Sequence, residues 1–562
     1  MKEKYIELMD KVLSAYSIEH ILRYFDDVKT NGLTEHGFPR LTANIGILIS
    51  HGRRHDLLPI FLEMMEFCCK TIPCVKAAND FSVREIVCCI REVERSGIVD
   101  AETVERWKGY LATIEPTTCY NVFAVTPADN VRNWALFTGV SEFFRQQMGL
   151  CDSMTFIDTQ IASQFQWLDE NGMYMDNKQA VNHQPMMYDL VPRGLFVLLL
   201  QDGYRGCHYE KIDAFLKKSA LLTLKMQSPN GEMAFGGRSN QFLHNEAWMI
   251  TVYEFEACRY AREGNIALAG EFKAAIKRAI SVTEYWLEME PILHIKNRFP
   301  TESFYGCEKY AYFDKYMITA ASNLYAAYLV CDDTIPTPAL SDIQPTVFQT
   351  TEYFHKLFLK SGGYGLEIDL DADPQYDASG LGRVHRVGAP SAICMSVPCP
   401  AAPKYHVDLD QPMPLALCPA VYDGEAWCFG AESDVKHEVV QADTTAGDAR
   451  ASVTCYFPKG RDVTSDYCVN GSGVAIGLSG TGKIGYLLPA FSFDGETEAQ
   501  IDADENSLTV RYKGWLCRYT VEGGQIEDLD RMAANRNGHY LTYLAVGTDS
   551  MRIGIEIVPV EL

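Results

Sequence analysis

The hydrophobic pattern of this chain changes its period once, and that change limits the possible folds more than any other feature. Up to about residue 335, apolar residues recur at three- and four-residue steps, as in 57–69 (LLPIFLEMMEFCC) and 83–94 (VREIVCCIREVE). This spacing is typical of helices with a buried face. Later apolar runs are short and alternating or β-branched, as in 473–480 (GVAIGLSG) and 551–560 (MRIGIEIVPV). Gly, Asp and Asn turns divide them at roughly hairpin spacing, which indicates antiparallel strands.

The change falls at residues 331–345 (CDDTIPTPALSDIQP), where three prolines stand close together. Before it, many helices without intervening strands predict helical hairpins arranged as a bundle, solenoid or ring. No fixed-length repeat supports a repeat family. After it, the strands predict an antiparallel sandwich, in which we include the run 391–398 (SAICMSVP).

The charge balance limits the class of partner. The chain has 74 acidic and 50 basic residues, a formal net charge of -24, which opposes a nucleic-acid partner. A small anionic ligand in one basic pocket remains allowed. The sequence does not fix an oligomeric state, and a homo-oligomer is compatible with it.

The sequence offers no membrane segment and no metal motif. Charges interrupt the N-terminal stretch every few residues, and no run of about 18 apolar residues occurs. The 18 cysteines lack the paired CxxC spacing of a zinc site. We therefore expect reduced thiols in a cytoplasmic protein, without a metal or cofactor.

The densest polar cluster lies in residues 231–248 (GEMAFGGRSNQFLHNEAW), among aromatic residues. Arg238 offers a planar fork that fits a carboxylate through two hydrogen bonds. A polar ligand pocket with apolar walls would satisfy this cluster, and a buried structural network is the alternative. Asn240 and His244 are further candidate binding residues, and Glu246 is a candidate catalytic acid.

Two other helical segments carry candidates. Glu85 stands among apolar neighbours in 83–94, where a carboxylate must be paired or have a raised pKa. An exposed glutamate in a surface ion pair is the alternative. Trp134 opens a helix, and its ring can stack on a sugar face or pack in the core.

The segment 176–196 (DNKQAVNHQPMMYDLVPRGLF) adds a histidine and a tyrosine about one helical turn apart. His183 can exchange a proton near neutral pH and Tyr188 can donate one, which makes both candidate catalytic groups. Asn182 and Arg193 are candidate binding residues beside them.

Three more candidate binding residues come from later in the chain. Tyr305 lies in the aromatic stretch 298–317, which suits a cleft for sugars as well as core packing. His385 and Arg386 lie at the start of the β half, where they either close the pocket or pair with acids at an interface.

A helical half, an all-β half and a pocket of Arg, His, Asn, Glu and aromatic residues together resemble two groups of carbohydrate enzymes. These are the heparinase II/III-like polysaccharide lyases and glycoside hydrolase family 154, which acts on β-glucuronides. The resemblance covers nearly the whole chain. It implies an N-terminal (α/α) toroid of helical hairpins at 1–335 and a C-terminal antiparallel β-sandwich at 345–562.

The lyases bind the uronate carboxylate with Asn or His and use Tyr and His as base and acid. The VNHQ stretch is similar to their Asn–His element, at Asn182 and His183, and His385 is similar to their second histidine. Their tyrosine has no counterpart here before Tyr253, so elimination would require Tyr188 or a later tyrosine.

The hydrolase resemblance implies two carboxylic acids instead. Glu85 and Glu246 are the candidates, and Arg238, assisted by Arg386, would hold the sugar carboxylate. The alternative carboxylic acids are Glu232, Glu302, Glu308 and Asp189. Because the chain reads as cytoplasmic and acidic, we predict an exo-acting β-glucuronidase for a glucuronide or glucuronate-containing oligosaccharide. A β-eliminating lyase and a non-catalytic glycan-binding protein are the alternatives.

Overall fold

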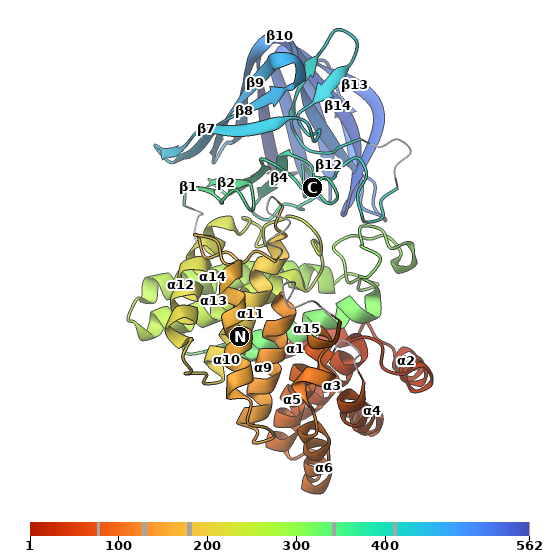
Figure 1. The fold of residues 1–562 in the computed structure, drawn as a ribbon. Coiled ribbons are helices and arrows are strands. Elements are labelled where there is room, and N and C mark those ends of the chain that lie inside the picture. Colours follow the sequence, from red (N-terminus) through yellow and green to blue (C-terminus); the bar gives the residue numbers. More distant parts are fainter. Residues whose placement is uncertain (76–78, 126–131, 177–182, 340–343, 409–412, 561–562) are drawn as a thin grey trace.

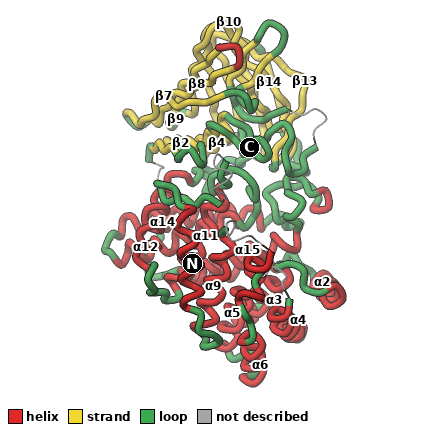
Figure 2. The backbone as a smooth tube through the Cα atoms, in the orientation of Figure 1, coloured by secondary structure: helices red, strands yellow, loops and turns green. Residues whose placement is uncertain are grey.

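A helical half and a β half are stacked end to end in the computed structural model (Figures 1 and 2). It describes residues 1–75, 79–125, 132–176, 183–339, 344–408 and 413–560. The last helix ends at Val330 and the first strand begins at Thr346. We keep 1–335 and 345–562 as the proposed domains.

The helical half is built from a ring. Its helices are α1 (Lys2–Leu13), α2 (Ile18–Asn31), α3 (Gly37–Ser50), α4 (Leu58–Thr71), α5 (Asn79–Ser96), α6 (Ala101–Ala112), α7 (Pro116–Cys119), α8 (Asn121–Val125), α9 (Asn133–Gln147), α10 (Met154–Gln164), α11 (Met186–Gln201), α12 (Tyr209–Met226), α13 (Asn245–Arg262), α14 (Ile266–Leu287) and α15 (Phe313–Val330). Helices α3, α5, α9, α11, α13 and α15 each pack on the next, and α15 packs back on α3. Helices α1, α4, α10, α12 and α14 flank this ring, which confirms the predicted toroid.

The inner helices are buried on nearly every side. In α3, every residue from Gly37 to Ile49 is buried, as expected for a helix surrounded by others. Glycines allow the closest approaches. A Cβ at Gly194 of α11 would lie 2.0 Å from the Trp248 indole of α13.

We expect Gly46→Ala in α3 to destabilise the toroid by about 1–3 kcal/mol, the usual cost of overpacking a dense core. Its Cβ would lie 2.4 Å from the Cys89 Sγ and from the Phe61 ring. Gly109→Ala in α6 is the matched control, because no atom lies within 4 Å of its added Cβ. The control should instead stabilise by about 0.4–1 kcal/mol. Urea unfolding midpoints measure both changes, and equal midpoints would contradict the packing described here.

The β half consists of antiparallel sheets. Its strands are β1 (Thr346–Gln349), β2 (Lys356–Ser361), β3 (Tyr364–Asp369), β4 (Gly380–Arg386), β5 (Pro419–Tyr422), β6 (Trp427–Phe429), β7 (Lys436–Thr445), β8 (Asp448–Phe457), β9 (Arg461–Asn470), β10 (Gly473–Phe493), β11 (Gln500–Ala503), β12 (Ser507–Tyr512), β13 (Trp515–Asn535) and β14 (Gly538–Pro559). One sheet has the order β1-β2-β3-β4, and the larger has β11-β12-β13-β14-β10-β9-β8-β7, with β5 and β6 beside β10. The smaller sheet contacts β7, β8 and β9 and lies next to the helices, which confirms the predicted sandwich (Figure 1).

One predicted strand is wrong. Residues 391–398 are irregular, and among them only Met395 makes a bridge, to Val384. Pro390 precedes this run and Pro398 ends it, and proline cannot donate to a strand ladder.

The β13–β14 hairpin turn reaches back to the helical half. Asn537 Nδ2 donates to the Lys296 carbonyl at 2.6 Å, and the Arg536 guanidinium binds the Glu308 carboxylate at 3.0 and 3.1 Å. These groups are buried, so the turn is part of the contact between the halves. Among the described residues, no helix has the length and apolar character needed to cross a membrane.

Candidate functional site

A cavity of about 540 Å³ lies in the toroid where the inner helices begin, and we call it the toroid pocket. Its lining residues are His36, Arg40, Phe81, Val122, Arg132, Asn133, Trp134, Phe137, Asp176, Met187, Tyr188, Val191, Arg238, Ser239, His244, Trp248, Tyr310, Lys315, Tyr316 and Thr319. All six inner helices contribute residues from their first two turns. Helix N-termini carry unpaired N–H groups and partial positive charge, so this end of the ring favours an anion.

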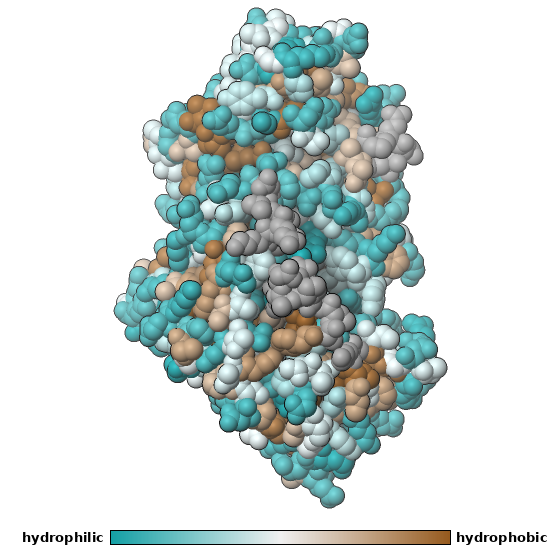
Figure 3. Space-filling model, viewed as in Figure 1, coloured by the Kyte–Doolittle hydropathy of each residue, from teal (hydrophilic) through white to brown (hydrophobic). Residues whose placement is uncertain are grey.

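The charged side chains of the toroid pocket are mostly basic. Arg40, Arg132, Arg238 and Lys315 line it, whereas Asp176 is the single carboxylate among the described lining residues. The chain as a whole has a net charge of -24, and hydrophilic side chains spread over both halves of its surface (Figure 3). The pocket is therefore a local basic region in an acidic protein, which suits a small anionic ligand.

Asp176 holds Arg238 in place. Its two carboxylate oxygens accept from Arg238 Nη2 and from Asn133 Nδ2, each at 2.6 Å. The Arg238 side chain is 32% exposed, so its remaining donors can reach a ligand. Burial lowers the pKa of Arg238, but Tyr188 and Asp176 together raise it above its usual value. The Arg238 guanidinium group is thus fixed in position, charged and facing the cavity.

Tyrosine hydroxyls gather at Ser239, next to Arg238. The Ser239 hydroxyl lies 2.9 Å from the Tyr310 hydroxyl and 3.3 Å from that of Tyr188. The Arg238 guanidinium carbon lies 4.5 Å from the centre of the Tyr188 ring. Burial raises the pKa of Tyr188 although Arg238 opposes this, so the phenol stays protonated at neutral pH and can donate.

The loop 236–244, which carries Arg238 and Ser239, has a strained backbone and is held by contacts with other segments. Gly237, Ser239 and Gln241 have φ values of 71°, 59° and 64°, which are unfavourable for the two residues other than glycine. The Ser239 N–H donates to Glu308 at 2.7 Å, and Glu308 is held in turn by Arg536 of the β half. The contact between the halves therefore fixes the geometry of the toroid pocket.

His244 supplies a neutral base beside the tyrosines. It immediately precedes α13, and its ring centre lies 5.3 Å from that of Tyr316. Burial, and secondly the charge of Arg40, lower the pKa of His244 to about 3. Its Nδ1 has no hydrogen-bond partner within the described chain. The imidazole is therefore neutral in the free protein, and a bound ligand carboxylate would raise its pKa toward the range of a general base.

We expect His244 of the free protein to remain uncharged from pH 8 down to about pH 5. Its folded pKa of about 3 lies below the usual 6.5. The contribution of His244 to stability is therefore complete above pH 6.5 and is lost as the pH falls toward 3. Nitrogen chemical shifts of labelled histidines, assigned with His244→Gln, measure this directly. Titration of His244 near pH 6.5 would contradict the described burial.

Four of the residues predicted from the sequence meet in the toroid pocket: Trp134, Tyr188, Arg238 and His244. Trp134 is 37% exposed and packs edge-on against Phe81, with ring centres 5.1 Å apart. It therefore presents a free aromatic surface toward a ligand.

The two predicted catalytic carboxylates do not line this pocket. Glu85 is buried and forms an ion pair with Arg84 and another with Arg40, the latter at 3.3 Å. Burial raises its pKa, but the two arginines outweigh burial and lower it. Glu246 is buried in a separate ion pair with Lys296, at 2.6 Å. The alternative of a surface-exposed Glu85 is wrong, because its side chain is only 5% exposed.

The predicted His183 and Arg193 also lie elsewhere. His183 Nδ1 is 3.1 Å from the Asp371 carbonyl, in the β half. Arg193 is fully buried, binds Asp189 and donates to Thr223 at 2.6 Å. Asn182 lies outside the described residues.

The remaining predicted binding residues make structural contacts outside the toroid pocket. The Tyr305 hydroxyl donates to the Gly538 carbonyl at 3.1 Å, and Asn240 Oδ1 accepts from Gln241 at 3.0 Å. His385 Nδ1 lies 2.8 Å from the Ser228 hydroxyl. Arg386 donates to the Tyr364 hydroxyl at 3.3 Å.

The sequence interpretation missed His36, Arg40, Asp176, Lys315 and Tyr316. Four of them share one signal, because each lies close to the start of an apolar inner helix: His36 and Arg40 at α3, Lys315 and Tyr316 at α15. Polar residues at the beginnings of successive apolar helices could have identified this rim. Among the described residues, no group of three or more His, Cys, Asp or Glu side chains could hold a metal ion.

Comparisons with known proteins establish the fold. No protein-family model and no curated protein sequence matches the chain. Among solved structures, the chondroitin AC lyase of Streptomyces coelicolor A3, in complex with chondroitin sulphate, superposes with a TM-score of 0.50 at 10% identity, over 99% of this chain and 79% of that one. This likeness confirms the predicted toroid-plus-sandwich architecture.

Two further solved structures give lower scores. The heparan sulfate lyase HepC of Pedobacter heparinus has a TM-score of 0.41 at 8% identity, over 93% of this chain and 76% of that one. A glycosyl hydrolase family 88 protein of Bacteroides vulgatus has a TM-score of 0.37 at 11% identity, over 59% of this chain and 99% of that one.

Proposed function

We propose that this chain is a carbohydrate-active enzyme that cleaves a uronic-acid-containing glycan by β-elimination in the toroid pocket. One observation carries the proposal. Neutral His244 and the tyrosine hydroxyls lie among basic side chains, and Asp176, the single carboxylate among the described lining residues, already binds Arg238. A chondroitin lyase uses the same architecture, which supports the proposal by analogy alone.

In this proposal, the basic groups bind the carboxylate of the uronate ring. Arg238 has free donors and a fixed orientation, which suits charge-assisted hydrogen bonds to a carboxylate. Lys315 adds positive charge from the start of α15. Trp134 and Tyr316 provide aromatic surfaces on which the apolar faces of sugar rings can pack.

The elimination begins at the carbon next to the sugar carboxylate, C5. Neutral His244 takes the C5 proton, and Arg238 stabilises the negative charge that develops on the carboxylate. The electron pair left on C5 forms the C4–C5 double bond as the C4–O bond breaks. Tyr188 donates its proton to the departing oxygen, and exchange with water restores both groups. The products are an unsaturated uronate and a shortened sugar with a new hydroxyl group.

The β-glucuronidase predicted from the sequence is the competing reaction. Glycoside hydrolysis needs two carboxyl groups that flank the scissile bond. Glu85 and Glu246 occupy separate buried ion pairs, so they are poorly placed for that role. Hydrolysis in the toroid pocket would also require Asp176 to act while it binds Arg238. We therefore rank elimination first.

One experiment separates the two reactions. The protein is incubated with chondroitin- and heparan-derived oligosaccharides and with a chromogenic β-glucuronide. Elimination produces ultraviolet absorbance and one unsaturated fragment that is lighter by one water than the corresponding hydrolysis product. Release of the chromophore without an unsaturated product would replace elimination by hydrolysis. No cleavage of any substrate would contradict the proposed activity.

A further inference from the structure

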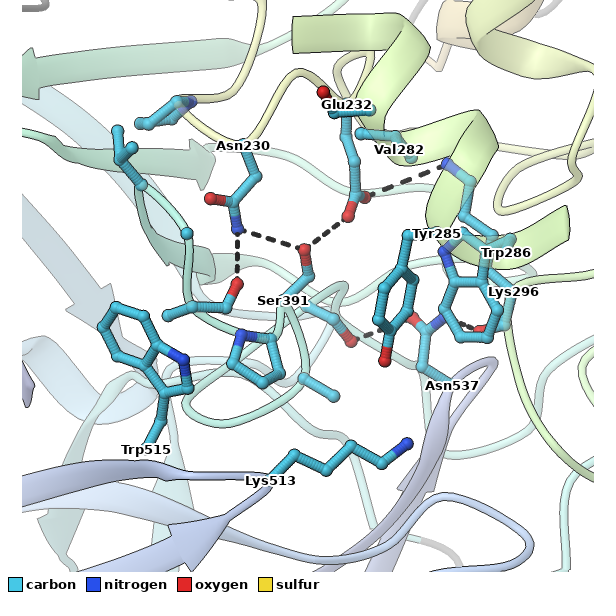
Figure 4. A pocket seen from close by; sticks show the side chains of 18 of the residues that line it. Asn230, Glu232, Val282, Tyr285, Trp286, Lys296, Ser391, Lys513, Trp515 and Asn537 are labelled. Carbon is cyan, nitrogen blue, oxygen red and sulfur yellow. Dashed lines mark hydrogen bonds and ion pairs between the residues drawn. The ribbon is translucent and has the colours of Figure 1, made fainter. Parts of the chain in front are cut away.

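A second cavity, of about 520 Å³, lies where the helical half meets the β half, and we call it the junction pocket (Figure 4). Helix α14 and the loop before Glu232 line it from one side, and the start of β13 and the loop around Ser391 line it from the other. It shares no lining residue with the toroid pocket. The two cavities can therefore be tested separately.

Aromatic side chains from both halves border the junction pocket. Tyr285 and Trp286 come from α14, and Trp515 begins β13. In Figure 4, Trp515 lies on the opposite side of the drawn group from Tyr285 and Trp286. Tyr285 is 40% exposed, so part of its ring is accessible to a ligand. Flat, partly exposed rings of this kind pack well against the C–H faces of a sugar ring.

Two buried acceptor atoms of this pocket lack hydrogen-bond partners among the described residues: Glu232 Oε2 and Asn230 Oδ1. Glu232 is only 4% exposed, and the cations nearest to Oε2 are Arg383 at 3.6 Å and Lys296 at 4.0 Å. Both cations lie beyond hydrogen-bond distance. Buried polar atoms without partners are rare in proteins, and a ligand would explain these two.

The unpaired atoms indicate the chemistry of the ligand. Both are acceptors, so they require donors such as sugar hydroxyl groups. Two lining cations are already neutralised, Lys296 by Glu246 at 2.6 Å and Lys513 by Asp494 at 2.8 Å. Arg278 has no ion pair within the described chain and offers further donors. Hydroxyl groups supply these donors without adding a second negative charge beside Glu232, which favours a neutral ligand.

We propose that the junction pocket is a second binding site, for a neutral saccharide. The sugar ring lies between Trp515 and the pair Tyr285 and Trp286, and its hydroxyl groups donate to Glu232 and Asn230. The site does not depend on the proposed elimination. It binds either a free neutral sugar or a neutral unit of a longer glycan, because both present the same ring and hydroxyl groups.

Titration calorimetry with cellobiose, lactose, maltose and glucuronic acid tests this site. We expect at least one neutral disaccharide to bind saturably. Trp515→Ala and Tyr285→Ala, in different halves of the protein, should each weaken that binding at least about tenfold. Tyr456→Ala is the matched control, because it removes an exposed tyrosine of the β half outside both pockets, and it should leave the affinity for the neutral sugar unchanged.

Other outcomes overturn the proposal. The site is refuted if no neutral disaccharide binds, or if binding survives in folded Trp515→Ala or Tyr285→Ala. Binding of glucuronic acid alone that is sensitive to Trp515→Ala would refute its preference for neutral sugars. A neutral disaccharide that binds while all acidic oligosaccharides remain uncleaved would support this site and contradict only the proposed function.

Discussion

Arg238→Ala should lower kcat/KM for an acidic oligosaccharide by about 100- to 1,000-fold, the usual cost of removing one charge-stabilising donor. Asp176 holds Arg238 at 2.6 Å and the Arg238 guanidinium lies over the Tyr188 ring, so in the proposed elimination Arg238 would bind the sugar carboxylate and orient the acid. Its loss should raise KM and lower kcat together. Initial rates followed by ultraviolet absorbance measure both constants.

Two further variants show whether the guanidinium itself matters. Arg238→Lys keeps the charge but loses the planar fork, and should recover part of the activity. Arg511→Ala removes an exposed arginine that pairs with Asp502 at 2.7 Å in the β half, and should change kcat/KM less than about twofold. An Arg238→Ala protein that is folded and about as active as the unmodified chain would refute the assigned role of Arg238.

His244→Gln should lower kcat by about 100- to 10,000-fold while leaving KM nearly unchanged. Glutamine approximates the size and polarity of histidine but cannot accept the C5 proton. The control His55→Gln replaces an exposed histidine outside the toroid pocket and should retain full activity. Measuring kcat and KM at several pH values separates two causes of lost activity. Loss of the base lowers kcat and leaves KM unchanged, whereas a misplaced substrate changes KM as well.

The same experiment discriminates between two hypotheses for the histidine. The sequence resemblance assigns catalysis to His183, which contacts the Asp371 carbonyl outside the toroid pocket. An inactive His183→Gln together with an active His244→Gln would support that assignment and contradict the elimination proposed here.

The architecture could be predicted because each half has its own hydrophobic period. The three- and four-residue steps before residue 335 became a ring of helices, and the alternating runs after 345 became antiparallel sheets. The exception at 391–398 has a local cause, since one proline precedes and another ends an apolar run that otherwise resembles a strand. The apolar pattern predicted a strand, but it does not show the effect of prolines, which lack the backbone N–H that a strand ladder needs.

The candidate site was only partly predictable. Arg238 and His244 stood out because polar groups crowd among aromatic residues in one short stretch. Arg40 and Lys315 did not, because they join the pocket only when α15 closes the ring against α3.

The ion pairs of the two predicted catalytic glutamates also could not be predicted from the sequence. A glutamate among apolar neighbours must be neutralised, but the sequence does not identify its partner. Arg40 comes from another helix to pair with Glu85, and Lys296 lies 50 positions after Glu246. Both glutamates were therefore interpreted as catalytic when the structure places them in buried ion pairs.

The most direct test of the central claim is a crystal structure of His244→Gln soaked with a uronate-containing oligosaccharide. We expect the sugar to lie in the toroid pocket with its carboxylate oxygens about 2.7–2.9 Å from the Arg238 guanidinium, the range of charge-assisted hydrogen bonds. The uronate should also lie with C5 facing residue 244. A uronate bound outside the toroid pocket, or with its carboxylate turned away from Arg238, would contradict β-elimination in this pocket.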